Sequence, residues 1–294
     1  MKTHIMFLLL AMLTWQCFQP TASAQNPNSG FSKKIKTIES YRMNSPLGDK
    51  THESSEHFDK DGKLIKRLTY NSYLSGGTDE MNCTYDAQGN SKCITKDESG
   101  KQIYFYENKY EGENVVEEKS SYETIKYAYD KNGNVLLKEK YDSEGNFSNA
   151  EKYELEYLDG TTNLKSKTTF EKRKDGNFKI YGKDKYTYNK NGKLATELAR
   201  TNFYEYRYTY IYYPNGNLKE KTTENGDSEK IITKYHENGK RRIEAIFRSE
   251  GPTFPMELDQ KNKWTYDEQD NEILAEHIRN EKLVSKRITE IIYY

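Results

Sequence analysis

The chain has 294 residues and no net charge, because 46 Lys and Arg residues balance 46 Asp and Glu residues. This balance argues against a nucleic-acid partner, since there is no excess of basic residues to neutralise phosphates. Aliphatic residues are scarce for a folded chain, and 26 tyrosines supply the apolar area that a core needs.

The N-terminus has the three parts of an export signal. Lys2 precedes an apolar run over residues 5–13 that is too short to span a bilayer. The small residues Ala22 and Ala24 then indicate cleavage after Ala24. We therefore expect residues 1–24 to be a cleaved signal peptide and the protein to be periplasmic or extracellular.

A second interpretation of this segment is a lipoprotein anchored through Cys17. We rank it second because the residues before Cys17 are too bulky for a good lipobox. No later segment approaches the run of about 20 apolar residues that a membrane helix needs. We expect no membrane span in the mature protein.

The mature chain divides into a lead-in segment and a repeat domain. Residues 25–52 form the lead-in and can contribute a first strand, and residues 53–294 carry the repeats. At their boundary, His52 and His57 are five residues apart, whereas a zinc-binding helix needs histidines four apart. We expect a solvated loop there, and no metal or cofactor in the protein.

Two cysteines remain after signal cleavage, and their spacing fits a hairpin. Cys83 and Cys93 flank the turn at residues 86–89, which places them nearly opposite on two strands. An even pair in an oxidising compartment predicts a disulfide. Because cross-strand geometry is demanding, two reduced thiols are the alternative.

A short turn motif recurs along the repeat domain, and Tyr85-Asp86-Ala87-Gln88-Gly89-Asn90 is one clear copy. The Asp or Asn accepts hydrogen bonds from backbone N–H groups further along the turn. The next two residues form a type I turn, and the glycine takes a positive φ, as in short β-hairpins. The predicted positive-φ turn residues are Gly62, Gly89, Asn114, Gly133, Gly145, Gly192, Gly216, Gly239 and Asp270.

Strands flank these turns. The clearest is a row in which every second residue is a tyrosine, while charged or polar residues fill the other face. We predict an all-β protein, a repetitive antiparallel hairpin meander forming a long twisted sheet that can curl into an open shell. The tyrosines of this row are Tyr204, Tyr206, Tyr208, Tyr210 and Tyr212.

These turns resemble the YD repeat of Rhs-type, wall-associated and teneurin proteins. Residues 210–247 also resemble the short repeats of MORN-type antitoxin-like proteins. In Rhs proteins such repeats form a sheet shell around a toxin carried at the end of the chain. This sequence has fewer repeats and no recognisable toxin domain, so the resemblance implies the sheet architecture and little about activity.

The tyrosine row from Tyr204 to Tyr212 has two interpretations: it is the repeat's own core, or it is an exposed platform for a glycan or a protein. No nucleophile motif accompanies the abundant serines and acids. We therefore expect a non-enzymatic protein that binds or scaffolds a glycan or surface protein at the bacterial envelope or outside the cell. An immunity or antitoxin-like protein that masks a toxin is the alternative, and an unrecognised enzyme is third.

Overall fold

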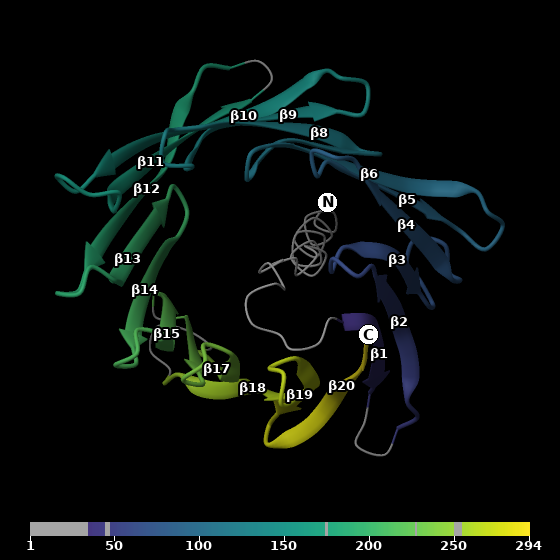
Figure 1. The fold of residues 1–294 in the computed structure, drawn as a ribbon. Helices are drawn as coiled ribbons and strands as arrows, with labels where there is room; N and C mark the ends of the chain where they lie inside the picture. Colours follow the sequence, from purple (N-terminus) through teal and green to yellow (C-terminus); the bar gives the residue numbers. More distant parts are fainter. Residues whose placement is uncertain (1–34, 45–47, 174–175, 227, 250–254) are drawn as a thin grey trace, which may run out of the picture.

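The computed structural model describes residues 35–44, 48–173, 176–226, 228–249 and 255–294. All regular elements in this part of the chain are β-strands (Figure 1). No helix among the described residues is long and apolar enough to cross a membrane. The expected signal peptide and Cys17 lie outside the described residues.

Twenty strands follow one another along the chain. They are β1 Ile35–Met43, β2 Thr51–Phe58, β3 Leu64–Thr69, β4 Asp79–Tyr85, β5 Ser91–Lys96, β6 Gln102–Glu111, β7 Asn114–Ser120, β8 Glu123–Tyr129, β9 Val135–Asp142, β10 Phe147–Tyr157, β11 Leu164–Arg173, β12 Lys179–Tyr188, β13 Leu194–Thr201, β14 Glu205–Tyr212, β15 Leu218–Asn225, β16 Glu229–Tyr235, β17 Arg241–Arg248, β18 Glu257–Tyr266, β19 Glu272–Arg279 and β20 Lys282–Tyr293.

The sheet closes on itself. Each strand pairs antiparallel with the next one, and β1 pairs with both β2 and β20, so the chain forms a 20-stranded barrel (Figure 1). The predicted antiparallel meander is confirmed, but the predicted open sheet is wrong. Closure pairs the N–H and C=O groups that two free edge strands would leave exposed.

The strand in the lead-in segment is the one that closes the ring. Its contacts with β20 run from Ile35 opposite Tyr293 to Met43 opposite Lys286. The boundary placed between residues 52 and 53 falls inside β2. The solvated loop expected around the two histidines is wrong, because those residues pair with β1 as part of β2.

Because consecutive strands are antiparallel, their connections alternate between the two ends of the barrel. We call the end with the nine connections from β2–β3 to β18–β19 the polar rim. Its turns follow the repeat motif: the Asp86 carboxylate, for example, accepts hydrogen bonds from the N–H groups of Gln88 and Asn90, both at 2.9 Å. Gly89 has a φ of 87° in this turn.

One predicted turn residue is misplaced. Only Gly112 and Glu113 separate β6 from β7, so Asn114 is the first residue of β7 and pairs with Glu111. Gly112 carries the positive φ, 61°, in its place. A two-residue hairpin turn replaces the longer motif here, which is why alignment on the longer motif failed.

The other predicted turn residues all have positive φ, from 63° at Asp270 to 89° at Gly216. Gly145 lies at the opposite end of the barrel from the rest, in the β9–β10 connection. A further turn of the same kind, built on Asp97 and Gly100, joins β5 to β6 without a preceding aromatic residue.

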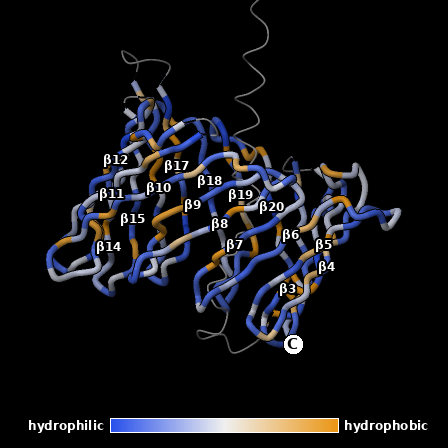
Figure 2. Tube along the Cα trace, turned by 90° about the horizontal axis from the view of Figure 1, so that it is seen from above, coloured by the Kyte–Doolittle hydropathy of each residue, from blue (hydrophilic) through white to orange (hydrophobic). Residues whose placement is uncertain are grey.

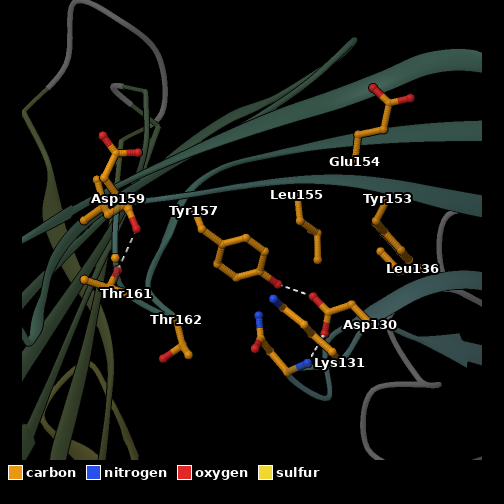
Figure 3. A pocket seen from close by; sticks show the side chains of 13 residues that line it. Asp130, Lys131, Leu136, Tyr153, Glu154, Leu155, Tyr157, Asp159, Thr161 and Thr162 are labelled. Atoms are coloured by element: carbon orange, nitrogen blue, oxygen red, sulfur yellow. Dashed lines mark hydrogen bonds between the residues drawn. The ribbon is translucent and has the colours of Figure 1, made fainter.

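The wall of the barrel has an inner and an outer face, and the side chains of the two faces are buried to different extents. Along β10, Tyr153, Leu155 and Tyr157 are half-buried, while the alternating Lys152 and Glu154 are exposed. Inside a closed ring, side chains of neighbouring strands converge and cover one another, so the half-buried face is the inner one. Figure 3 shows Glu154 directed away from the group that contains the two tyrosines.

Hydrophilic residues predominate along the strands (Figure 2). Charged residues such as Lys152 and Glu154 occupy the outer face. Ion pairs between adjacent strands lie along it, such as Lys66–Glu80 at 2.9 Å and Lys230–Glu224 at 3.0 Å. Each such exposed pair contributes little to stability, but together the charges keep the wall hydrated.

A ring of 20 strands has a backbone diameter of about 30–40 Å. The inward-facing side chains of the described strands cannot by themselves fill so wide a ring. The buried apolar residues of the described chain are few and small: Cys83, Ile125, Ala150 and Ile246.

Candidate functional site

The inner face of β6, β8, β10, β12 and β14 carries tyrosines, and we call this part of the inner face the tyrosine wall. The tyrosines of each strand are an even number of residues apart, and the two-residue period of a strand places them on one face. The wall contains Tyr104, Tyr106, Tyr127, Tyr129, Tyr153, Tyr157, Tyr186, Tyr188, Tyr206, Tyr208, Tyr210 and Tyr212.

The predicted row on β14 belongs to this wall, except for its first member. The rings of Tyr206 and Tyr208 are stacked with centroids 6.3 Å apart, and both are half-buried. Tyr204 precedes the strand and is 55% exposed. The structure therefore places the row neither in a closed core nor on the outer surface, but on the inner wall.

The tyrosines that end the strands are structural. Several of their hydroxyl groups donate to a backbone carbonyl at the start of a neighbouring strand, as Tyr188 does to Leu164 and Tyr212 to Leu194, both at 2.8 Å. Phenylalanine cannot make this bond, which explains the recurrence of tyrosine before the turn. These hydroxyls are already used by the fold.

Tyrosines further upstream on the same strands are different, because their hydroxyls contact carboxylates of the inner face. Cross-strand register brings two of these pairs together, so spacing along the sequence gave no signal for Glu118 and Glu197. The other two pairs join residues two positions apart on one strand. The pairs are Tyr127–Glu118 at 2.9 Å, Tyr210–Glu197 at 3.1 Å, Tyr186–Asp184 at 3.4 Å and Tyr153–Glu151.

These pairs change the acidity of the tyrosines. Burial, followed by the charge and hydrogen bond of Glu118, raises the pKa of Tyr127. Burial and the nearby Glu118 also raise the pKa of Tyr106 to about 12. These tyrosines therefore remain neutral hydrogen-bond donors at physiological pH.

Lysines of the inner face complete the wall. The Lys167 Nζ lies 2.7 Å from the Asp184 carboxylate. The Lys221 Nζ lies 4.7 Å from the ring centroid of Tyr208 and 5.7 Å from that of Tyr210. The surface thus alternates aromatic faces, carboxylates and ammonium groups, all held by neighbours.

A hollow of about 900 Å³ opens at the polar rim, between the β8–β9 connection, β9, β10 and the β10–β11 connection (Figure 3). Tyr153, Leu155 and Tyr157 line one side, and Leu136 and Asp130 line the other. Its apolar faces lie beside a carboxylate, a combination that suits a ligand with both apolar and hydroxyl groups.

Asp130 in this hollow is held by four hydrogen-bonding groups. The Tyr157 hydroxyl donates to it, as do the N–H groups of Asn132 and Asn134. Burial alone would raise the pKa of Asp130, but these hydrogen bonds and one from the Asn134 side chain outweigh it and lower that pKa. The carboxylate is therefore a fixed anionic acceptor.

The two histidines of β2 belong to a separate cluster on the outer face. The Ser55 hydroxyl donates to Glu39 at 2.7 Å and lies 3.1 Å from the His57 Nε2, while His52 contacts the other Glu39 oxygen at 2.7 Å. A nucleophilic serine would donate to its histidine, whereas this one donates to the carboxylate and is 3% exposed. No group of three or more metal-ligating side chains occurs among the described residues.

Cys83 and Cys93 are direct partners on β4 and β5, with Cα atoms 4.0 Å apart, and a disulfide joins them. Cys83 is buried on the inner face. The bond closes the hairpin whose turn was the clearest copy of the repeat.

No protein-family model matches the chain, and no curated protein is significantly similar to it. Several solved structures are similar at low identity. A porin-like protein from Bacteroides uniformis is 13% identical over 88% of this chain and 98% of its own, with a TM-score of 0.36. A porin-like protein from Bacteroides vulgatus is 11% identical over 89% of this chain and 99% of its own, with a TM-score of 0.27. The Tc holotoxin pore of Photorhabdus luminescens is 10% identical over 86% of this chain and 18% of its own, with a TM-score of 0.29.

Proposed function

We propose that this protein is an exported, non-enzymatic binding protein of the bacterial envelope or the extracellular space, and that its tyrosine wall binds a glycan chain. The observation that carries the proposal is the set of inward tyrosines whose hydroxyls are held by carboxylates, as in the Tyr127–Glu118 and Tyr210–Glu197 pairs. These rings are fixed before a ligand arrives, so binding loses little side-chain entropy.

A sugar ring has an apolar face of C–H groups and an equatorial rim of hydroxyls. The half-buried rings of Tyr206 and Tyr208 offer flat apolar surface to the C–H face. Carboxylates such as Asp184 and Glu197 accept hydrogen bonds from hydroxyls. Repetition of this arrangement over five strands favours a polymer over a single small molecule.

Export is supported by the predicted signal peptide and by the Cys83–Cys93 disulfide, a bond that persists in oxidising compartments. The charged side chains of the outer face favour a barrel surrounded by water, because each Lys or Arg facing lipid at the middle of a bilayer costs about 2–4 kcal/mol. Lys152 and Lys230 are examples of such charges on the outer face.

The experiment is a screen of the mature protein against a glycan array, followed by calorimetric titration of each glycan that binds. The variant Y206A/Y208A removes two rings from the inner face of β14, and I211S changes the exposed outer face of the same strand as the matched control. We expect at least a tenfold weaker affinity for the double variant and no change for the control. Absence of binding to every glycan, or equal affinity of the double variant and the wild type, would refute the proposal.

The width of the ring favours a second candidate, a polypeptide held in the lumen, as in an immunity protein that masks a toxin. A ring of about 30–40 Å leaves space for a peptide segment between its walls. Affinity capture from envelope extract, using wild type beside Y206A/Y208A, distinguishes the two: one protein retained by the wild type and lost by the variant, with no glycan bound, favours the second candidate.

A further inference from the structure

A row of aromatic rings leads from the β13–β14 connection onto the inner wall. Phe203 and Tyr204 lie in the connection and are 75% and 55% exposed, while Tyr206 and Tyr208 follow on β14 and are half-buried. The ring centroids are 6.4 Å apart from Phe203 to Tyr204 and 6.3 Å apart at each of the next two steps. The row is therefore unbroken, with one end in solvent and the other on the tyrosine wall.

The exposed end of this row is held in place by hydrogen bonds. The Thr201 hydroxyl accepts the N–H groups of Phe203 at 3.2 Å and Tyr204 at 3.0 Å. The Asn202 side chain donates to the Ile180 carbonyl at 3.3 Å, which ties the connection to β12. The phenyl ring of Phe203 has no hydroxyl for a structural bond of the kind that the strand-end tyrosines make. An ordered backbone thus presents a large apolar ring to solvent.

Small or uncharged side chains lie beside the row on the inner face. Ala199 on β13 and Asn225 on β15 are the direct partners of Tyr206. Charge begins only at Tyr208, which has Glu197 as its partner on β13 and the Lys221 Nζ at 4.7 Å from its ring centroid. The rings of Phe203, Tyr204 and Tyr206 therefore adjoin neutral groups.

The charged side chains nearest to these three rings are used in pairs. Arg200 and Glu205 form an ion pair with each other on the outer face. On the inner face, beyond Ala199 and Asn225, Lys167 pairs with Asp184 at 2.7 Å and Arg248 with Glu229 at 3.2 Å. A ligand over the rings meets no excess of either charge, which suits a neutral chain.

We propose that Phe203, Tyr204 and Tyr206 form the subsite where a neutral glycan chain passes over the mouth of the barrel onto the tyrosine wall. This inference rests on the proposed glycan-binding function and names the class of chain. The apolar face of one sugar ring stacks on each aromatic ring in turn. The row continues into the tyrosine wall, so the same chain contacts both.

The tilt of the rings selects the shape of the chain. Adjacent ring planes differ by 55° from Phe203 to Tyr204 and by 42° from Tyr204 to Tyr206. A cellulose-type chain is a flat ribbon with nearly coplanar sugar rings, whereas an amylose-type chain turns each ring against the next. Platforms that are tilted against one another fit the turning chain, so the subsite favours an amylose-type chain.

Calorimetric titration of the mature protein with maltoheptaose and with cellohexaose tests the proposal. The variant F203A/Y204A removes the two exposed rings of the row. The control Y73A/L74A removes an aromatic and an aliphatic side chain, 100% and 57% exposed, from the β3–β4 connection. Circular dichroism and the thermal midpoint establish that both variants are folded.

We expect the wild type and the control to bind maltoheptaose more tightly than cellohexaose. F203A/Y204A should bind maltoheptaose about tenfold more weakly, because two stacking contacts are lost. Equal affinity of F203A/Y204A and the wild type, or tighter binding of cellohexaose, would overturn this inference. So would a wild-type dimer, detected by light scattering and lost in F203A/Y204A, without oligosaccharide binding.

The glycan array separates these failures from failure of the proposed function. If neither oligosaccharide binds but another glycan on the array does, and Y206A/Y208A weakens it, the inferred class of chain is wrong and the tyrosine wall remains a glycan site. If no glycan on the array binds, the proposed function and this inference both fail.

Discussion

At both rims of the barrel, a side-chain oxygen accepts hydrogen bonds from backbone N–H groups of the turn, but the side chain that supplies this oxygen differs. On the polar rim, a carboxylate such as that of Asp86 accepts two backbone N–H groups, and Gly89 completes the turn. On the opposite rim, Asp97 and Asp142 form two turns of the same kind. In the β13–β14 connection of that rim, the neutral hydroxyl of Thr201 accepts the N–H groups of Phe203 and Tyr204 instead. The opposite rim therefore mixes carboxylate turns with uncharged, exposed tips.

This difference implies that the carboxylate turns contribute to stability and that the exposed, uncharged tips do not. The largest effect on stability is expected at the β4–β5 hairpin, which the disulfide closes near the polar rim. Replacing both Cys83 and Cys93 by Ser should lower the free energy of unfolding by about 2–3 kcal/mol, because the unfolded chain gains conformational freedom. Urea denaturation of the variant measures this loss. An unchanged midpoint would mean that the disulfide does not constrain the fold.

A smaller effect is expected at a single turn glycine. Gly239 has a φ of 88°, and a Cβ there would meet no atom within 4 Å. Gly239→Val therefore tests backbone conformation without a steric clash, and should destabilise the protein by about 1–2 kcal/mol. Gly239→Asn, which tolerates a positive φ better, is the matched control. Equal stability of the two variants would contradict the backbone argument.

The wall between the rims predicts a loss of stability at alkaline pH. Burial, and then the charge of Glu118, raises the pKa of Tyr106 to about 12, above its ordinary value of 10.0. The contribution of Tyr106 to the free energy of unfolding is complete below pH 10, where its phenol is neutral in both the folded and the unfolded chain. It is lost as the pH rises from 10 through 12, because the unfolded chain ionises first. Thermal midpoints at pH 9 and pH 11 measure this change, and Glu118→Gln should reduce it. A midpoint that does not fall at pH 11 would contradict the buried wall.

The smallest effect on stability is expected at the exposed tip of the β13–β14 connection. Phe203→Ser should change the free energy of unfolding by less than about 0.5 kcal/mol, since the side chain is 75% exposed. Urea denaturation beside wild type measures it. A loss as large as that of Gly239→Val would show that the tip packs against the barrel, and would remove the distinction between the carboxylate turns and the uncharged tips.

The sequence allowed the turns and the strand period to be predicted because both depend on neighbouring residues. Gly89 and Asp270 were found from local backbone chemistry, and the same reasoning failed at Asn114, where only two residues separate the strands. Closure of the ring could not be predicted, because it depends on the accumulated twist of 20 strands and on pairing between residues 35 and 293.

The candidate site was predictable only in part for the same reason. The row ending at Tyr212 was visible from its period, but its position on an inner wall requires closure. The pairing of Tyr127 with Glu118 depends on cross-strand register, which a sequence of alternating charged residues leaves open. The difference between the two rims likewise follows from which connections share an end of the barrel.

The account rests on the closure of β1 on β20, since closure turns the tyrosine face into an inner wall. Ser40 and Thr289 are direct partners across this junction, as Cys83 and Cys93 are across theirs. In the variant Ser40→Cys/Thr289→Cys, mild oxidation should form an intramolecular disulfide, detected by mass spectrometry of the peptides. The control Ser40→Cys/Thr196→Cys, with the second cysteine on β13, should not form one. Absence of the Ser40→Cys/Thr289→Cys cross-link in the folded protein would show that the sheet is open, and would contradict the lumen on which the proposed binding wall depends.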